Sequence, residues 1–326
     1  MTKLPGARGP ATEALFAALE QPPHDFGPLP EPDSGEDLQL ALYCCYELHY
    51  RGFEGVDERW EWAPSLLAAR AGLEAPFEAE LLELTGAVGE GCEPAQMDVV
   101  LRELADEDDA PPVSRFIERE AEVDQLLEFL VHRSAYQLKE ADPHSWAIAR
   151  LSGGAKASLV EIQADEYGGG RPERIHAELF AKAMRAVGLD AAYGAYLDRL
   201  PAETLATVNL MSLCGLHRRL RGAIVGHLAL FEMTSSIPNR RYGRGLRRLG
   251  FTSADATDFF DEHVEADAVH ENIAAYDLAG GLARGEPELA DDIVFGARAL
   301  LHLEERFANH LLDSWREGGS SLRRPL

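Results

Sequence analysis

Cysteine is scarce in this sequence, with four residues in a chain of 326. Cys44, Cys45, Cys92 and Cys214 show no C-x-x-C spacing and are too few to cross-link a chain of this length. The composition therefore excludes a disulfide scaffold, and we expect the cysteines to be buried, reduced thiols.

Long hydrophobic runs and an excess of basic residues are also missing. No apolar run approaches the roughly 20 residues that span a bilayer, and Met1–Gly6 does not lead into an apolar signal core. The net charge is −25, from 31 basic and 56 acidic residues. Phosphate binding needs a basic surface, so we expect an acidic cytoplasmic protein that binds neither nucleic acid nor a membrane.

The residues that are present favour a globular, all-α chain. Hydrophobic residues make up 46% of the sequence, often at helical spacing, and no alternating strand pattern or repeat occurs. The predicted helical segments span residues 11–19, 37–52, 60–82, 114–140, 155–166, 172–188, 190–199, 202–235, 253–279 and 286–317.

The acidic and proline-rich run at residues 106–112 predicts a domain boundary, because such runs favour exposed connectors. We expect a helical N-terminal extension over residues 1–112 and a larger helical domain over residues 113–326. The extension is a candidate dimerisation segment, so a homodimer is one expectation.

His263, Asp267 and His270 carry the clearest chemical signal in the sequence. Spacings of four and three residues place them on one stripe of a helix. Burying these polar groups without a ligand would be costly, and two imidazoles with a carboxylate can bind a transition metal. One helix supplies too few ligands, so the others must come from elsewhere.

Glu173 and His176 form an E-x-x-H unit, from which carboxylate-bridged di-iron sites in helical bundles are built. Glu140, at the end of the preceding long helical pattern, is a third contributor. Three helices would then provide three carboxylates and three imidazoles, a plausible set for two irons with open positions for dioxygen.

With this order and spacing, residues 115–315 resemble the heme-oxygenase-like di-iron oxidases and oxygenases, a group of iron-containing redox enzymes. The resemblance implies a seven-helix bundle in which two irons activate dioxygen, and an external electron donor for turnover. Members of the group carry out N-oxygenation, oxidative decarboxylation or carbon–carbon cleavage of small amino-acid or fatty-acid-like substrates.

The resemblance also implies roles for the candidate ligands. Glu140, His176 and His270 would serve one iron, His263 and Asp267 would serve the other, and Glu173 would bridge them.

Two further carboxylates are candidate ligands. Glu166 stands beside three glycines at a predicted helix end, where it is either an extra ligand, as in some similar N-oxygenases, or an exposed terminal carboxylate. Glu232 lies within an apolar run, which predicts a buried role. That role is either as a ligand or as a neighbour of the ligands.

A basic segment, residues 239–248, is predicted as a loop between two core helices. Arginine suits carboxylate recognition, so Arg241 and Arg244 are candidates for holding an anionic substrate group. Pairing with the acidic surface of the protein itself is the alternative.

Two other functions compete with a di-iron oxidase. A metal-free hydrolase of the same fold, resembling the thiaminase type, would need a nucleophile, for which Cys214 is the one cysteine candidate. A non-enzymatic helical module would bind a partner protein through its N-terminal segment. Haem oxygenation is disfavoured, because haem needs one axial histidine rather than six metal ligands.

Overall fold

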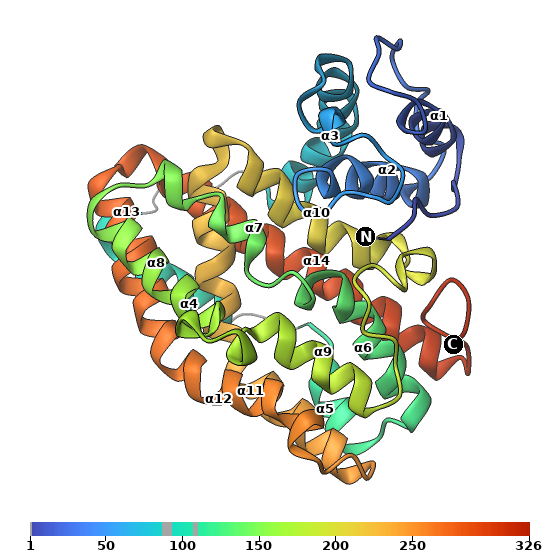
Figure 1. Cartoon of the computed structure of the whole chain (residues 1–326). Coiled ribbons are helices and arrows are strands. Elements are labelled where there is room, and N and C mark those ends of the chain that lie inside the picture. The colour runs from blue at the N-terminus through green and yellow to red at the C-terminus, as the bar shows by residue number, and fades with distance from the viewer. Residues whose placement is uncertain (1, 87–92, 107–109) are drawn as a thin grey trace.

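The computed structural model describes residues 2–86, 93–106 and 110–326, except for the side chains of residues 265–269. The predicted all-α fold is confirmed: within these ranges helices are the regular secondary structure, and the one β-bridge, between Thr2 and Phe53, is isolated (Figure 1). No helix in the described ranges combines the length and the apolar character needed to cross a membrane.

The helices follow one another in this order: α1 (Pro10–Leu19), α2 (Gly35–Glu47), α3 (Pro64–Thr85), α4 (Met97–Asp106), α5 (Val113–Arg119), α6 (Val123–Gln137), α7 (Asp142–Ser145), α8 (Gly153–Glu166), α9 (His176–Ala186), α10 (Ala202–Leu216), α11 (Arg221–Arg248), α12 (Ala254–Asn272), a π-helix (Ile273–Ala279), α13 (Gly280–Gly285) and α14 (Ala290–Arg316).

The crossing of α11 and α14 forms the centre of the bundle, and it depends on glycine. A Cβ at Gly226 would overlap the carbonyl group of Ile293, and a Cβ at Gly296 would overlap that of Ala223. The two backbones can approach this closely because neither position carries a side chain. This contact fixes the part of α11 that carries Glu232.

Helices α1, α2 and α3 cover one end of the bundle (Figure 1). α2 packs on α10 and α3 on α14, while α4 contacts α11, α14 and the π-helix. Asp37 of α2 accepts hydrogen bonds from the backbone N–H groups of Ala11 and Thr12, both at 2.9 Å, and so caps α1. The domain boundary at residue 112 remains a prediction.

Two predicted helices are broken in the structure. The single helix predicted over residues 114–140 is two helices, α5 and α6, and α6 ends at Gln137. Glu140 therefore lies in the turn after α6, and Pro143 sits in the first turn of α7 rather than ending a helix. The helix predicted over residues 202–235 is divided between α10 and α11 at His217, whose backbone is extended.

The helix predicted over residues 190–199 was wrong. The chain there forms turns and the short 3₁₀ helix Leu197–Arg199. The Asp190 carboxylate accepts from the Ala192 N–H at 2.8 Å, and Gly194 has a φ of 74°. A side-chain turn and a left-handed glycine both compete with helix formation.

The basic segment at residues 239–248 is also not a loop, because α11 continues through Pro238 to Arg248. The Asn239 amide donates to the Ser235 carbonyl at 3.1 Å beside the proline. At the other end, the Arg248 guanidinium donates to the carbonyls of Ile117, Glu118 and Ala121. Arg248 thus satisfies carbonyl groups at the C-terminal end of α5.

Candidate metal centre

Four side chains from four segments converge in the core of the bundle: Glu140, Glu166, His176 and His263. One potential ligand atom from each lies within 4.8 Å of the others, and all four residues are buried. Glu140 comes from the turn after α6, Glu166 ends α8, His176 begins α9 and His263 lies on α12. Such a set of oxygen and nitrogen atoms can hold a transition metal ion.

A second group adjoins the first. Glu166, Glu232 and His270 also offer ligand atoms within 4.8 Å of one another, and all three are buried. Glu232 comes from α11 and His270 from the last turn of α12, directly before the π-helix. Glu166 belongs to both groups. A carboxylate with two oxygens can serve two neighbouring metal ions from one position.

Short distances separate the candidate ligand atoms within each group. His176 Nδ1 lies 2.7 Å from Glu166 Oε2. The Nδ1 atom is buried, and its geometry does not meet that of a hydrogen bond. His263 Nε2 lies 3.6 Å from Glu140 Oε1. The imidazole rings of His176 and His263 are 4.4 Å apart between centroids. In the second group His270 Nδ1 also has no hydrogen bond, at 3.5 Å from Glu232 Oε2.

Neighbouring groups fix the orientation of both α12 imidazoles. The Phe259 carbonyl lies 2.7 Å from His263 Nδ1, which places the proton on Nδ1 and directs the lone pair of Nε2 towards Glu140. Asp165 Oδ2 lies 3.1 Å from His270 Nε2, which leaves His270 Nδ1 for the second group. A carbonyl or carboxylate behind an imidazole is typical of metal-binding histidines.

Gln137, at the end of α6, orients Glu140. With its nitrogen turned towards Glu140, the Gln137 amide donates to the two carboxylate oxygens at 2.9 and 3.1 Å. Sequence reasoning missed Gln137, Asp165 and the Phe259 carbonyl. Asp165 precedes a predicted ligand in sequence, but its contact with His270 depends on how α8 packs against the π-helix that follows α12.

Burial dominates the electrostatics of the carboxylates. It raises the pKa values of Glu140, Glu166 and Glu232, and nearby histidines offset part of each rise. Anionic oxygens in this setting are therefore costly without a cation.

The two histidines with orphaned Nδ1 atoms titrate in opposite directions. Burial and the neighbouring His263 lower the pKa of His176 to about 4, so its imidazole is neutral at pH 7. Burial alone would lower the pKa of His270, but Glu232, Asp165 and Glu166 outweigh it and raise that pKa to about 9. A neutral His176 is already in the form that binds a metal ion.

The donor set fits iron. Three buried carboxylates and three buried imidazoles, two of them with an Nδ1 atom that lacks a hydrogen bond, match the nitrogen and oxygen ligands of ferrous ion. Cationic metal would compensate the buried carboxylates and complete the coordination of both histidines.

The structure does not bring Glu173 into either group. Glu173 lies exposed in the short 3₁₀ helix Pro172–Arg174, and the extended backbone of Ile175, with ψ 128°, separates it from α9. The premise that Glu173 and His176 share a helix was therefore wrong. The structure also groups His176 with His263, which the resemblance assigned to different irons. Asp267 lies on α12, but its side chain is outside the described residues.

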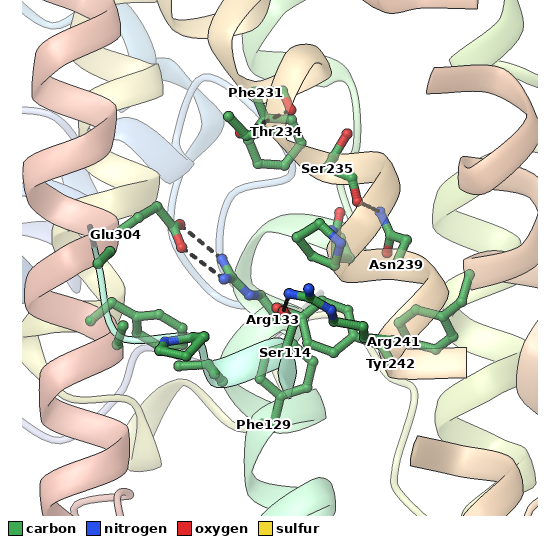
Figure 2. Close-up of a pocket in the computed structure, with 18 of the residues that line it drawn as sticks. Ser114, Phe129, Arg133, Phe231, Thr234, Ser235, Asn239, Arg241, Tyr242 and Glu304 are labelled. Carbon is green, nitrogen blue, oxygen red and sulfur yellow. Dashed lines mark hydrogen bonds and ion pairs between the residues drawn. The ribbon is translucent and has the colours of Figure 1, made fainter. Parts of the chain in front are cut away.

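A cavity of about 320 Å³ opens beside the two groups, between α6, α11, α12 and α14 (Figure 2). Most of its wall is apolar and includes Phe129, Phe180, Phe231 and Phe259. A second cavity of about 10 Å³ is lined by Glu140, Glu166, Glu232 and His263, and shares Phe231 and Ser235 with the first. These two side chains separate the large cavity from the candidate ligands.

The structure distinguishes the two candidate substrate-binding arginines. Arg241 lines the cavity and donates to Ser114 Oγ at 3.2 Å, and no carboxylate of the described residues forms an ion pair with it (Figure 2). Arg244 lies on the surface and pairs with Glu118 at 3.0 Å. The contact of Arg244 is the alternative considered for the basic segment, pairing with the acidic surface of the protein.

The fold and the site together define a helical protein with a buried carboxylate–histidine cluster that could hold metal ions. A sequence profile of the family described as iron-containing redox enzyme matches residues 127–305, more than half of the chain. The chain belongs to this heme-oxygenase-like family of redox enzymes, as the sequence resemblance predicts. No curated protein matches the sequence.

Proposed function

We propose that the protein is a non-haem di-iron oxidase or oxygenase that uses dioxygen to oxidise a small organic substrate. The observation that carries the proposal is the position of Glu166, which reaches both groups of candidate ligands. Glu140, His176 and His263 would hold one iron, Glu232 and His270 would hold the other, and Glu166 would contribute to both. Asp267 remains a candidate for an additional ligand.

Two bound ferrous ions would supply the electrons that reduce dioxygen, and an external electron donor would restore them for the next turnover. The side chains of the protein do the remaining work. Phe259 and Asp165 hold the two α12 imidazoles in their metal-binding orientation, and Gln137 holds Glu140. The buried setting excludes water from the reacting groups.

The large cavity is the proposed substrate site. Its aromatic and aliphatic wall would bury the apolar part of a substrate, and the Arg241 guanidinium would bind a carboxylate or another anionic group. Arg241 lies nine residues after Glu232 on α11, which corresponds to roughly 13 Å along the helix axis. The anionic group would therefore bind away from the iron, and the opposite end of the substrate would reach Phe231 and Ser235.

A metal-free hydrolase is less compatible with the structure. Cys214 is fully buried, and burial raises the pKa of its thiol well above the usual range. A buried, protonated thiol is a poor nucleophile. The two histidine nitrogens that lack a hydrogen bond, His176 Nδ1 and His270 Nδ1, instead belong to the carboxylate–histidine cluster.

A single-turnover measurement tests the proposal. The chain is loaded with ferrous iron without oxygen, and the dioxygen consumed after mixing is compared between the wild type and Glu166→Ala. A pair of bound ferrous ions would supply two electrons for each dioxygen, so we expect about one dioxygen consumed per loaded wild-type chain and almost none for the variant. Equal consumption by the two proteins, or none by the loaded wild type, would contradict the proposal.

A further inference from the structure

The turn that carries Glu140 also faces the N-terminal helices. Residues 138–141 connect α6 to α7, and consecutive side chains of this turn are buried in different surroundings. Glu140 lies in the candidate metal centre, whereas Lys139 Nζ lies 3.0 Å from Glu47 Oε2 at the end of α2. Both partners of this ion pair are 1% exposed.

The Lys139 ammonium group is held from several sides. It lies 4.9 Å from the centre of the Tyr43 ring and 4.3 Å from that of Tyr50, both within cation–π range. The Tyr193 hydroxyl donates to Glu47 Oε2 at 2.7 Å. A buried lysine with these partners has little freedom to move, because any displacement would leave a charge unpaired.

A second contact from the same N-terminal segment reaches the turn. The Arg51 guanidinium donates to the Leu138 carbonyl at 3.0 Å and stacks on the Tyr193 ring at 4.2 Å from its centre. The backbone N–H of Arg51 also donates to Glu47 Oε1 at 3.3 Å. Leu138 and Lys139 are the two residues before Glu140. Both are held by contacts from the N-terminal segment, Leu138 by Arg51 and Lys139 by Glu47.

We infer that Glu47 and Arg51 are positioning residues that hold the 138–141 turn and thereby aim the Glu140 carboxylate at the metal centre. Neither residue touches the centre, and both lie outside the part of the chain that matches the family, residues 127–305. The N-terminal segment would thus belong functionally to the metal site. This inference rests on the proposed function, because it assumes that Glu140 binds a metal ion.

The test is a Co(II) titration of the full-length protein, with Co(II) as a redox-stable probe that has an absorption spectrum sensitive to its ligands. We compare the wild type with Glu47→Gln and with Arg51→Gln, whose exposed side chain can be removed with less risk to folding. Glu74→Gln is the matched control. Glu74 is a buried N-terminal carboxylate that contacts Arg70, Tyr46 and His217 but not the turn.

We expect Glu47→Gln and Arg51→Gln to weaken the binding of one of the two Co(II) ions by about 10- to 100-fold, as the loss of contacts behind the ligands does at metal sites. Its spectrum should change as well, while the ion near Glu232 and His270 stays unaffected. Glu74→Gln should lower the unfolding temperature but leave both affinities and the spectrum unchanged.

Two results would overturn the inference. Wild-type affinities and spectra in Arg51→Gln and in folded Glu47→Gln would show that the turn needs no support from the N-terminal segment. A wild-type chain that binds no Co(II) would remove the proposed metal centre itself, and this inference with it. The two failures are distinguishable because the wild type is measured first.

Discussion

Replacing Glu166 with glutamine should abolish stabilisation by metal at both positions, because this side chain belongs to both groups of candidate ligands. A ligand present at 100 times its dissociation constant stabilises a folded protein by about 2.7 kcal/mol per site. An unfolding entropy of about 2.1 cal/mol/K per residue gives about 0.7 kcal/mol/K for 326 residues. Saturating Co(II) should therefore raise the unfolding temperature by about 4 K per site and about 8 K for two sites.

The assay is thermal unfolding followed by circular dichroism, with and without Co(II). We expect a shift of about 8 K for the wild type, about 4 K for Glu232→Gln, which belongs to one group, and little or none for Glu166→Gln. Glu173→Gln is the control and should keep the full shift, because Glu173 is exposed and lies in neither group.

The metal-free proteins provide a second comparison. Burial raises the pKa of Glu166, so the folded protein binds more protons than the unfolded chain above the ordinary pKa of glutamate, and stability falls as pH rises through that range. Metal-free Glu166→Gln should therefore be at least as stable at pH 7 as the metal-free wild type. A full metal shift in Glu166→Gln would refute the assignment of a shared ligand.

Three further predictions concern the cavity, the core and the fold. Arg241→Gln should weaken the binding of a carboxylate probe such as octanoate by about tenfold or more, as measured by calorimetry, because a charge-assisted hydrogen bond worth about 1.4 kcal/mol or more is lost. Arg244→Gln should leave the affinity for the probe unchanged. Equal effects of the two substitutions would remove Arg241 as an anchor. Burial lowers the pKa of His227 to about 3, so below about pH 6.5 this histidine is protonated in the unfolded chain but not in the folded protein. The free energy of unfolding, measured with urea, should therefore fall by roughly 2 kcal/mol through this group by pH 5. A His227→Gln variant whose stability depends on pH as steeply as that of the wild type would contradict this. Gly226→Ala should lower the free energy of unfolding by about 1–3 kcal/mol, because its Cβ would overlap the Ile293 carbonyl. Gly72→Ala, in open space on α3, should not lower it. Equal unfolding temperatures for the two variants would argue against the close crossing of α11 and α14.

The helical periodicity of the sequence was sufficient to predict that two candidate ligands share one face of a helix. His263 and His270 lie seven residues apart on α12, and both reach the candidate metal centre from one face because two turns of a helix restore the same direction. Local patterns of this kind are readable without knowledge of tertiary packing. The all-α fold follows from the same signal.

The E-x-x-H unit shows where this reasoning fails. Glu173 and His176 have the spacing of helix neighbours, but Ile175 has an extended backbone and α9 starts only at His176. The three glycines before Pro172 all have positive φ values, so the chain there follows a turn that helical periodicity cannot describe. A predicted pair on a helix face therefore needs a continuous helix between its members.

The shared role of Glu166 depends on tertiary structure. Its position at the end of α8 and beside glycines left two interpretations open, a ligand or an exposed carboxylate. Only the tertiary fold, in which α8 packs against the π-helix that follows α12, brings its two oxygens near His176 and His270. The support for Glu140 from Gln137 and the N-terminal segment is equally non-local, since Glu47 lies 92 residues before Lys139.

Binding of a pair of iron ions by this chain is open to direct measurement. The most direct measurement is the number of ferrous ions bound per chain after anaerobic titration and removal of free metal, determined by elemental analysis for the wild type and His263→Ala. We expect close to two ions for the wild type and about one for the variant, because His263 belongs to one group of candidate ligands. A wild-type chain that retains no iron, or a variant that retains as much as the wild type, would contradict this expectation.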